Sequence, residues 1–218
     1  MTLTAIRDAL HAHGLMPRGA FHPDDDALRD ARTIVLIGNA GPDMWRAFSA
    51  ARQPGPDPLY AWTRAVLNPL AVRFRGAMIY PFDGPPYAPF VAWARQAEAV
   101  YVSPVGMAVH PVHGLWHAWR GALALPDRIA LPPRSNAPSP CTTCAGQPCL
   151  SACPVDALVD GGYDVPACTA YLRTPEGADC KSRGCLARRA CPVGRADRYG
   201  PAQAAWHMAA FLKGQPQP

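Results

Sequence analysis

The chain has 218 residues and a mass of 23.4 kDa; 49% of its residues are hydrophobic and 17% are charged. This much apolar material can bury one sizeable core, which excludes a disordered polymer, and the length allows one domain with a small appendage. The formal net charge of +5 is modest and by itself does not indicate a nucleic-acid-binding protein.

The first residues predict a short amphipathic helix, because Leu3, Ile6 and Leu10 fall on one stripe. They contain no charged leader followed by an apolar run, and no uninterrupted apolar stretch of about 18 residues occurs in the sequence. We therefore expect a cytoplasmic protein without a membrane span, in which cysteine thiols stay reduced.

Strand and helix signals alternate along the following part of the chain. The predicted strands are residues 33–38, 77–82, 105–109 and 117–125, and the predicted helices are residues 44–52, 59–75 and 90–98. Pro69 is expected to kink the second of these helices or to start another one. The alternation favours a layered α/β sheet, with an α+β arrangement as the alternative.

Composition divides the chain into four parts. They are an α/β body for cofactor or partner binding (residues 1–130), a proline-rich linker (131–140), a ferredoxin-like module (141–198), and a C-terminal helix with a tail (199–218). Within the last part, residues 202–213 form the helix candidate.

All eight cysteines lie between Cys141 and Cys191. Their order is Cys141-x2-Cys144-x4-Cys149-x3-Cys153-Pro154, then Cys168, then Cys180-x4-Cys185-x5-Cys191-Pro192. Bacterial ferredoxins place a Cys-Pro step after a run of three cysteines, and the cysteine of that step ligates the other of two clusters. Here both halves end in the same Ala-Cys-Pro-Val signature, and two cubane clusters need eight thiolates. The pattern predicts two [4Fe–4S] clusters.

The ligand pairing follows from the shape of a cubane, whose four irons occupy tetrahedral corners. A tight loop supplies three ligands more readily than four, so the fourth is expected from the distant half of the module. The predicted sets are Cys141, Cys144, Cys149 and Cys191 for the first cluster, and Cys153, Cys168, Cys180 and Cys185 for the second. The four-residue gaps before Cys149 and Cys185 are wider than in bacterial ferredoxins, so the presence of clusters is better supported than their pairing. The alternatives are structural zinc, for which only one C-x2-C pair is present, and disulfides or a single damaged cluster.

A basic stretch accompanies the second half of the module: Lys181, Arg183, Arg188, Arg189, Arg195 and Arg198. Two explanations are open. The stretch is a docking face for an acidic electron donor such as a ferredoxin, a flavodoxin or a flavoprotein reductase, or it compensates the negative charge of the clusters. We expect neither a membrane nor a nucleic acid as partner.

Three histidines and two tryptophans crowd residues 110–119. If the flanking segments are strands, His110 and Trp116 face a shared pocket and contact a bound cofactor. The alternatives are that His110 closes the end of a strand while Trp116 and Trp119 belong to the core, or that His110, His113 and His117 bind zinc. The loop at residues 82–87 either lines a pocket, covers the clusters or is a well-packed turn.

The Cys-Pro module, residues 168–172 and the stretch GMAVHPVHGLWHAWRGALAL resemble the corrinoid-handling reductases. Epoxyqueuosine reductases join a corrinoid-binding, nitroreductase-like domain to two such clusters and carry an isolated cysteine where this chain has Cys168. The cobalamin-processing family of methylmalonic aciduria type C has the same body without clusters and a similar His-Pro, Gly, Trp, Arg-Gly series. The resemblance implies a nitroreductase-like body in which His110, Trp116 and Arg120 contact cobalamin or another corrinoid.

The sequence also departs from the epoxyqueuosine reductases. Those proteins carry a C-terminal helical repeat that grips tRNA, whereas this chain ends about 27 residues after Cys191. We therefore do not expect it to reduce epoxyqueuosine in tRNA.

Three functions follow from these observations. The first is an iron–sulfur electron-transfer protein whose clusters reduce a corrinoid held by the body, which would make it an iron–sulfur reductase. The second is a plain ferredoxin-type carrier whose body is a scaffold for partner docking, and the third is a structural zinc module. The sequence identifies no catalytic side chain, because every cysteine is assigned as a metal ligand.

Overall fold

The structure is a computed structural model that describes residues 1–24, 28, 30–159 and 162–216. Packing divides the chain into two compact units. The first, here called the sheet unit, comprises Met1–Ala99 and His117–Ala137. The second, the cysteine unit, comprises Val100–Trp116 and Pro138–Pro218. Segment Val100–Trp116 thus packs with the cysteines, although it lies far from them in the sequence.

The sheet unit is built on four strands in the order β1-β2-β6-β3, and each neighbouring pair is antiparallel. Their bounds are β1 (Met16–Phe21), β2 (Thr33–Ala40), β3 (Ala77–Ile79) and β6 (His117–Leu125). The longest pairing joins β2 to β6, from Thr33 opposite Leu125 to Ala40 opposite His117. The sheet-and-helix body is confirmed, and its antiparallel pairing is the α+β arrangement rather than a parallel α/β sheet.

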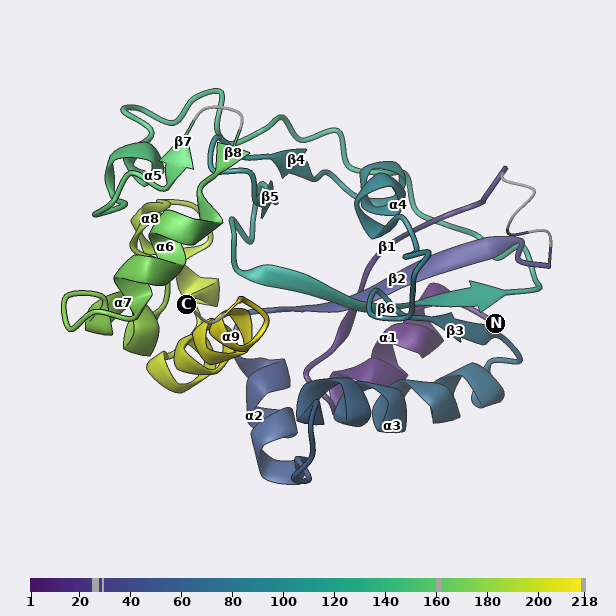
Figure 1. Cartoon of the computed structure of the whole chain (residues 1–218). Coiled ribbons are helices and arrows are strands. Elements are labelled where there is room, and N and C mark those ends of the chain that lie inside the picture. The colour runs from purple at the N-terminus through teal and green to yellow at the C-terminus, as the bar shows by residue number, and fades with distance from the viewer. Residues whose placement is uncertain (25–27, 29, 160–161, 217–218) are drawn as a thin grey trace. The chain divides into compact units, whose positions relative to one another are not determined.

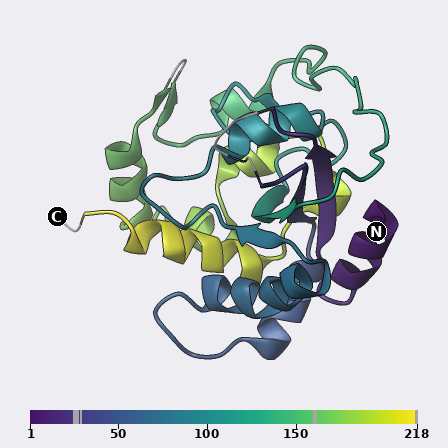
Figure 2. The same ribbon diagram turned by 90° about the vertical axis from the view of Figure 1, so that its right-hand side faces the viewer.

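Helices cover both faces of this sheet. Its helices are α1 (Leu3–His11), α2 (Asp43–Ala51), α3 (Pro58–Arg73) and α4 (Phe90–Ala97). Helices α2 and α3 lie on one face and α4 on the other (Figures 1 and 2). Because both faces are covered, every residue of β2 is buried.

The N-terminal helix is confirmed, with Ile6 and Leu10 buried. Thr2 is its N-cap, and its Oγ1 accepts a hydrogen bond from the Ala5 N–H at 3.2 Å. Helix α3 continues through Pro69 as one element, so the expected start of a second helix there is wrong.

The cysteine unit consists of short elements. In chain order they are β4 (Tyr101–Val102), β5 (Ala108–Val109), α5 (Pro148–Ser151), β7 (Leu158–Val159), β8 (Gly162–Tyr163), α6 (Val165–Leu172), α7 (Ala178–Arg183), α8 (Leu186–Ala190), the 3-10 turn η2 (Arg195–Asp197) and α9 (Pro201–Lys213). Strand β4 pairs with β5, and β7 pairs with β8. Helix α9 confirms the predicted C-terminal helix and packs against α7. Within the described residues, no helix has the length and apolar character needed to cross a membrane.

The segment around the HPVHG turn differs from its prediction. Strand β6 has the predicted bounds, but the preceding strand is only β5, which pairs with β4 rather than with β6. Backbone hydrogen bonds between His110 and Gly114, in both directions at 2.8–2.9 Å, close the turn on itself. Strand β1 was not predicted, because its sequence MPRGAF contains a proline and a glycine that weaken a strand pattern.

Candidate metal centre

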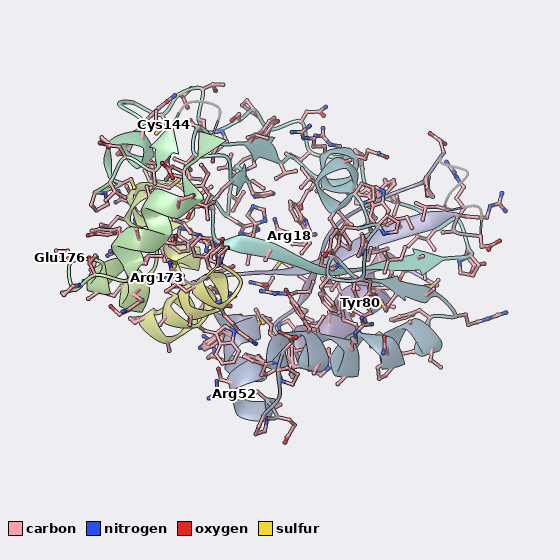
Figure 3. All side chains as sticks on the ribbon, in the orientation of Figure 1. Arg18, Arg52, Tyr80, Cys144, Arg173 and Glu176 are labelled. Carbon is pink, nitrogen blue, oxygen red and sulfur yellow. The ribbon has the colours of Figure 1, made fainter. Side chains whose placement is uncertain are left out.

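Cys141, Cys144, Cys149 and Cys191 form one group in the cysteine unit. Cys149 and Cys191 belong to a buried apolar cluster with Val105, Val109, Leu115 and Ala187, against which Cys141 packs. Burial raises the pKa of the Cys141 and Cys149 thiols, and the neighbouring Cys191 raises both further. Cys144, which lies in the loop before α5, is also close enough to raise them (Figure 3).

Cys153, Cys168, Cys180 and Cys185 form a second group. All four line a cavity of about 280 Å³, here called the cysteine cavity, whose other walls are mostly apolar. Burial raises the pKa of Cys168 and Cys180, and Cys185 raises both further. Cys168 shares a hydrogen bond with the hydroxyl of Tyr163, whose own pKa is raised mainly by burial.

Each group contains one cysteine from the other half of the module. Cys153 belongs to the N-terminal run but lies with the second group, and Cys191 belongs to the C-terminal run but lies with the first. These are the same two sets that the cubane argument predicts. Their roles as cluster ligands stay predictions.

The arrangement is more open than a site for one ion. Nowhere in the described residues do three His, Cys, Asp or Glu side chains come close enough to share a single metal ion. A zinc site requires four ligands around one centre, whereas a cubane spreads its thiolates over four iron corners.

Left-handed turns accommodate the widened cysteine gaps. Between Cys144 and Cys149, Gly146 and Gln147 both adopt positive φ, at 69° and 37°. Between Cys180 and Cys185, Gly184 does so at 87°. Glycine adopts this conformation without the penalty that a Cβ imposes. The first gap is therefore a turn, whereas in the second gap helix α7 continues to Arg183 and ends at Gly184.

Helix α8 joins the two groups, with Cys185 just before it and Cys191 just after it. Its Arg188 donates from Nε and Nη2 to the carbonyl oxygen of Leu115, at 3.0 and 2.5 Å. The guanidinium lies 4.7 Å from the ring centre of Trp116 and 4.6 Å from that of Tyr199. The Arg188 guanidinium therefore binds the segment before β6 to helix α8, because it hydrogen-bonds to Leu115 and lies between the rings of Trp116 and Tyr199.

Two donors in the cysteine unit suit an acceptor made of sulfur. The Ala157 N–H donates to Sγ of Cys153 at 3.3 Å. Trp116 lines the cysteine cavity with 3% of its surface exposed, and its indole Nε1 is buried without a hydrogen-bond partner. A buried orphan N–H is costly, and a thiolate or an inorganic sulfide in the cavity would accept from it. The donor set thus fits a cluster.

The structure gives His110 a local role. Its Nδ1 accepts hydrogen bonds from the backbone N–H groups of Val112 and His113, at 3.1 and 3.2 Å. Its ring stacks on that of His113, and His113 in turn contacts Asp197 through Nδ1 at 2.8 Å. His110 directly follows β5, as in the alternative that places it at the end of a strand.

The remaining members of the histidine and tryptophan segment belong to the sheet unit. On β6, Arg120 is buried, and its Nε donates to Oδ1 of Asn39 at 3.2 Å. His117 lies on the same strand, and its ring packs edge-on against Trp119. Because His110 and Trp116 lie in the cysteine unit and Arg120 in the sheet unit, the proposed corrinoid contacts of these three residues stay predictions.

A buried ion pair in the sheet unit was not predicted from the sequence. Arg18 on β1 donates from Nη2 to Oε2 of Glu98 at 2.9 Å, and Trp119 donates to Oε1 of the same carboxylate at 2.8 Å. Nε and Nη1 of Arg18, labelled in Figure 3, are buried without a hydrogen-bond partner. No local pattern reveals this pair, because its members lie 80 residues apart.

The loop at residues 82–87 is anchored as a packed turn. Phe82 stacks on Tyr60 and Tyr80 with ring centres 4.1 and 5.0 Å apart, and the Arg64 guanidinium lies against Tyr80 and Phe82. The Tyr80 hydroxyl donates to Oδ1 of Asn68 at 2.6 Å, and burial raises its pKa to about 12. This packing matches the last of the three alternatives for the loop.

Sequence reasoning also missed part of the wall of the cysteine cavity. Tyr163, Tyr199 and, from helix α9, Ala204, His207 and Phe211 line it together with the cysteines. The helix was predictable from its own sequence, but nothing in the sequence indicates that it packs beside the cysteines.

These units define a class: a mixed sheet-and-helix protein with a four-stranded antiparallel sheet and a cysteine-rich second unit. Solved epoxyqueuosine reductases have a similar fold. The enzyme from Streptococcus thermophilus superposes with a TM-score of 0.54 at 15% identity, over 93% of this chain and 69% of that one. The enzyme from Bacillus subtilis gives 0.51 at 15% identity, over 90% and 65%. A complex with an epoxyqueuosine-modified tRNA-Tyr stem loop gives 0.51 at 16% identity, over 89% and 65%.

The chain thus spans about two thirds of the length of these proteins. No protein-family model matches its sequence, and no curated protein does. At this level of identity the likeness is one of fold.

Proposed function

We propose that this chain is an iron–sulfur electron-transfer protein that binds two [4Fe–4S] clusters. The observation that carries the proposal is the exchange of Cys153 and Cys191 between two groups of four cysteines. Two groups of four thiols, each with one member from the other run, would suit two clusters bound as in bacterial ferredoxins.

The chain's own groups are suited to hold such clusters and to set their potentials. The cysteines are buried or half-buried, and the raised pKa values of Cys141, Cys149, Cys168 and Cys180 mean that cluster binding must displace protons from these thiols. When bound, each cluster supplies one-electron transfer. The Ala157 N–H donates to Sγ of Cys153, the unpaired indole N–H of Trp116 is available to a sulfur acceptor, and Arg188 places a cation at the wall of the cysteine cavity. Hydrogen bonds and positive charge both favour the reduced, more anionic cluster.

The decisive experiment is anaerobic reconstitution of the whole chain with iron and sulfide. We expect about eight iron and eight sulfide per chain, and paramagnetic resonance signals from two interacting clusters after reduction with dithionite. About two zinc ions with no sulfide would support the zinc module instead. A sample that takes up neither iron nor sulfide contradicts the proposal.

For the electron acceptor, we propose a corrinoid such as cobalamin. The resemblance of residues 106–125 to corrinoid-handling proteins supports this choice, and the likeness in fold to epoxyqueuosine reductases is consistent with it. Hydroxocobalamin titrated into the reconstituted protein should shift the corrin absorption bands. If the bands do not shift and the protein is not stabilised against heat, the chain is a plain electron carrier whose sheet unit serves as a scaffold.

A further inference from the structure

The cysteine unit contains a second cavity, of about 450 Å³, here called the arginine pocket. It is lined by Ala152, Arg183, Leu186, Arg189, Ala190, Arg198, Tyr199 and Pro201. Three of these residues are direct neighbours of cysteines in the chain. Ala152 precedes Cys153 and Leu186 follows Cys185, both of the second group, and Ala190 precedes Cys191 of the first. A molecule in this pocket therefore lies against the backbone that carries ligands of both proposed clusters.

The charge of the pocket is positive. Three arginines line it, and the carboxylate paired with them is that of Asp179, which contacts Arg189 closely and Arg183 at 3.5 Å. The side chain of Arg183 is 63% exposed, and among the residues that the structure describes its one ion pair is this long contact. One carboxylate against three guanidinium groups leaves an excess of positive charge that faces solvent.

Backbone hydrogen bonds hold two of the three arginines in place. Arg189 donates from Nε to the carbonyl of Gly184 at 3.1 Å. Arg198 donates from Nη2 to the carbonyl of Arg189 at 2.5 Å and, more weakly, to that of Cys191 at 3.4 Å. Their positions are set before any partner arrives, which lowers the entropic cost of binding one.

The structure separates the two explanations of the basic stretch. Arg188 lies between Trp116 and Tyr199 and lines the cysteine cavity, so it compensates cluster charge from within. Arg183, Arg189 and Arg198 line a different cavity that opens beside α8. Arg189 also acts on a proposed ligand, because its positive charge opposes the rise in the pKa of the Cys180 thiol. Charge compensation therefore accounts for Arg188 and Arg189 but not for Arg183 and Arg198, which are exposed.

We infer that the arginine pocket is the docking surface for an acidic electron-donor protein and that electrons enter the clusters there. The inference rests on the proposed function. Carboxylates around the donor's prosthetic group would pair with the three guanidinium groups, and the opposite charges would speed encounter and orient the donor. In the redox step the donor's reduced prosthetic group loses one electron and an oxidised cluster gains it; no bond forms or breaks.

The test uses the reconstituted chain and a reduced, acidic flavodoxin as the probe. Flavin oxidation is followed by anaerobic stopped-flow at low ionic strength. Arg183→Glu reverses the charge of an exposed pocket residue, and Arg183→Lys preserves it. The matched control is Arg95→Glu, which makes the same charge change at an exposed position on α4 in the sheet unit.

We expect Arg183→Glu to slow electron transfer by about tenfold, while Arg183→Lys and Arg95→Glu stay near the wild-type rate. At high salt the difference should disappear, because screening shortens the reach of the charges. Dithionite, which needs no docking surface, should reduce all four proteins at the same rate.

Three results overturn the inference. They are equal slowing by the Arg183 and Arg95 reversals, a wild-type rate that does not depend on salt, and no transfer from flavodoxin at all. If Arg183→Glu instead abolishes binding of an RNA stem loop and leaves the flavodoxin rate unchanged, the pocket serves RNA and the inference is again wrong. In each case, full iron and sulfide content with normal reduction by dithionite leaves the proposed function intact. If the wild-type protein holds neither cluster, both the proposed function and the docking inference are refuted.

Discussion

Arg188 is the residue whose replacement tests the architecture of the cysteine unit most directly. Arg188→Met removes the guanidinium and keeps an apolar stem. Each ring contact, at 4.7 and 4.6 Å, is worth about 0.5–1 kcal/mol at a partly exposed site. The hydrogen bonding of the charged group to Leu115 contributes about 1.5–3 kcal/mol. We expect the free energy of unfolding to fall by about 3–4 kcal/mol.

The assay is anaerobic urea unfolding of the reconstituted protein, followed by tryptophan fluorescence. With a slope of about 2–3 kcal/mol per molar urea, the midpoint should fall by about 1–2 M. Arg188→Lys keeps the cation and one donor and should lose roughly half as much. The reduction potential of the second cluster should become more negative in Arg188→Met and change little in Arg188→Lys, because only the former removes a positive charge from the wall of the cysteine cavity.

The matched control is Arg95→Met on the exposed surface of α4, which should change stability by no more than about 0.5 kcal/mol. If Arg188→Met costs no more than this control and leaves both cluster potentials unchanged, the cation between Trp116 and Tyr199 stabilises nothing and the reasoning is refuted.

Three further predictions follow from the same geometry. Cys191→Ser should remove the first cluster and Cys153→Ser the second, each leaving about four irons per chain; loss of the opposite cluster, seen by paramagnetic resonance, would contradict the ligand sets. Gly114→Ala should destabilise the protein by about 2–4 kcal/mol, because φ is +56° and a Cβ would overlap the carbonyl oxygen of Val193. An unchanged melting temperature would show that these segments do not pack as described. Glu98→Ala should lower the free energy of unfolding by about 3–5 kcal/mol, because it leaves the buried Arg18 guanidinium unpaired. Glu98→Gln should lower it less, and both are measured by urea unfolding followed by circular dichroism. Equal losses in the two variants would mean that the charge pairing is unimportant.

The elements that were predictable are those whose signal is local. The stripe of Leu3, Ile6 and Leu10, the β-branched run that begins at Thr33 and the helical pattern near the C-terminus each correspond to a described element. Strand β1 lacks such a signal and exists because the edge of β2 pairs with it, from Met16 opposite Gly38 to Phe21 opposite Ile34. A strand that forms because it pairs with a neighbouring strand cannot be recognised from its own residues.

The region around the HPVHG turn shows a different limit, since its local pattern predicted strands on both sides of the turn but not the strands with which they pair. Residues 105–109 and 117–125 resemble a hairpin, yet the chain changes unit between them at Trp116. Gly114 lies against the backbone of residues 193–194, with no room for a side chain. Which segment packs on which depends on shape over the whole unit, and a short window of sequence does not contain that information.

By itself, the sequence determined where ligands for metal clusters are concentrated: eight thiols and two Cys-Pro steps lie between Cys141 and Pro192. That information is local, because residue type and separation along the chain decide which thiols can reach one cubane. Only the tertiary structure decided the roles of the arginines around them. Arg188 and Arg189 are adjacent in the sequence, but the first lies between two aromatic rings and the second lines an open pocket. Successive residues of a helix point about 100° apart, so packing rather than composition places one between the rings and the other in the pocket.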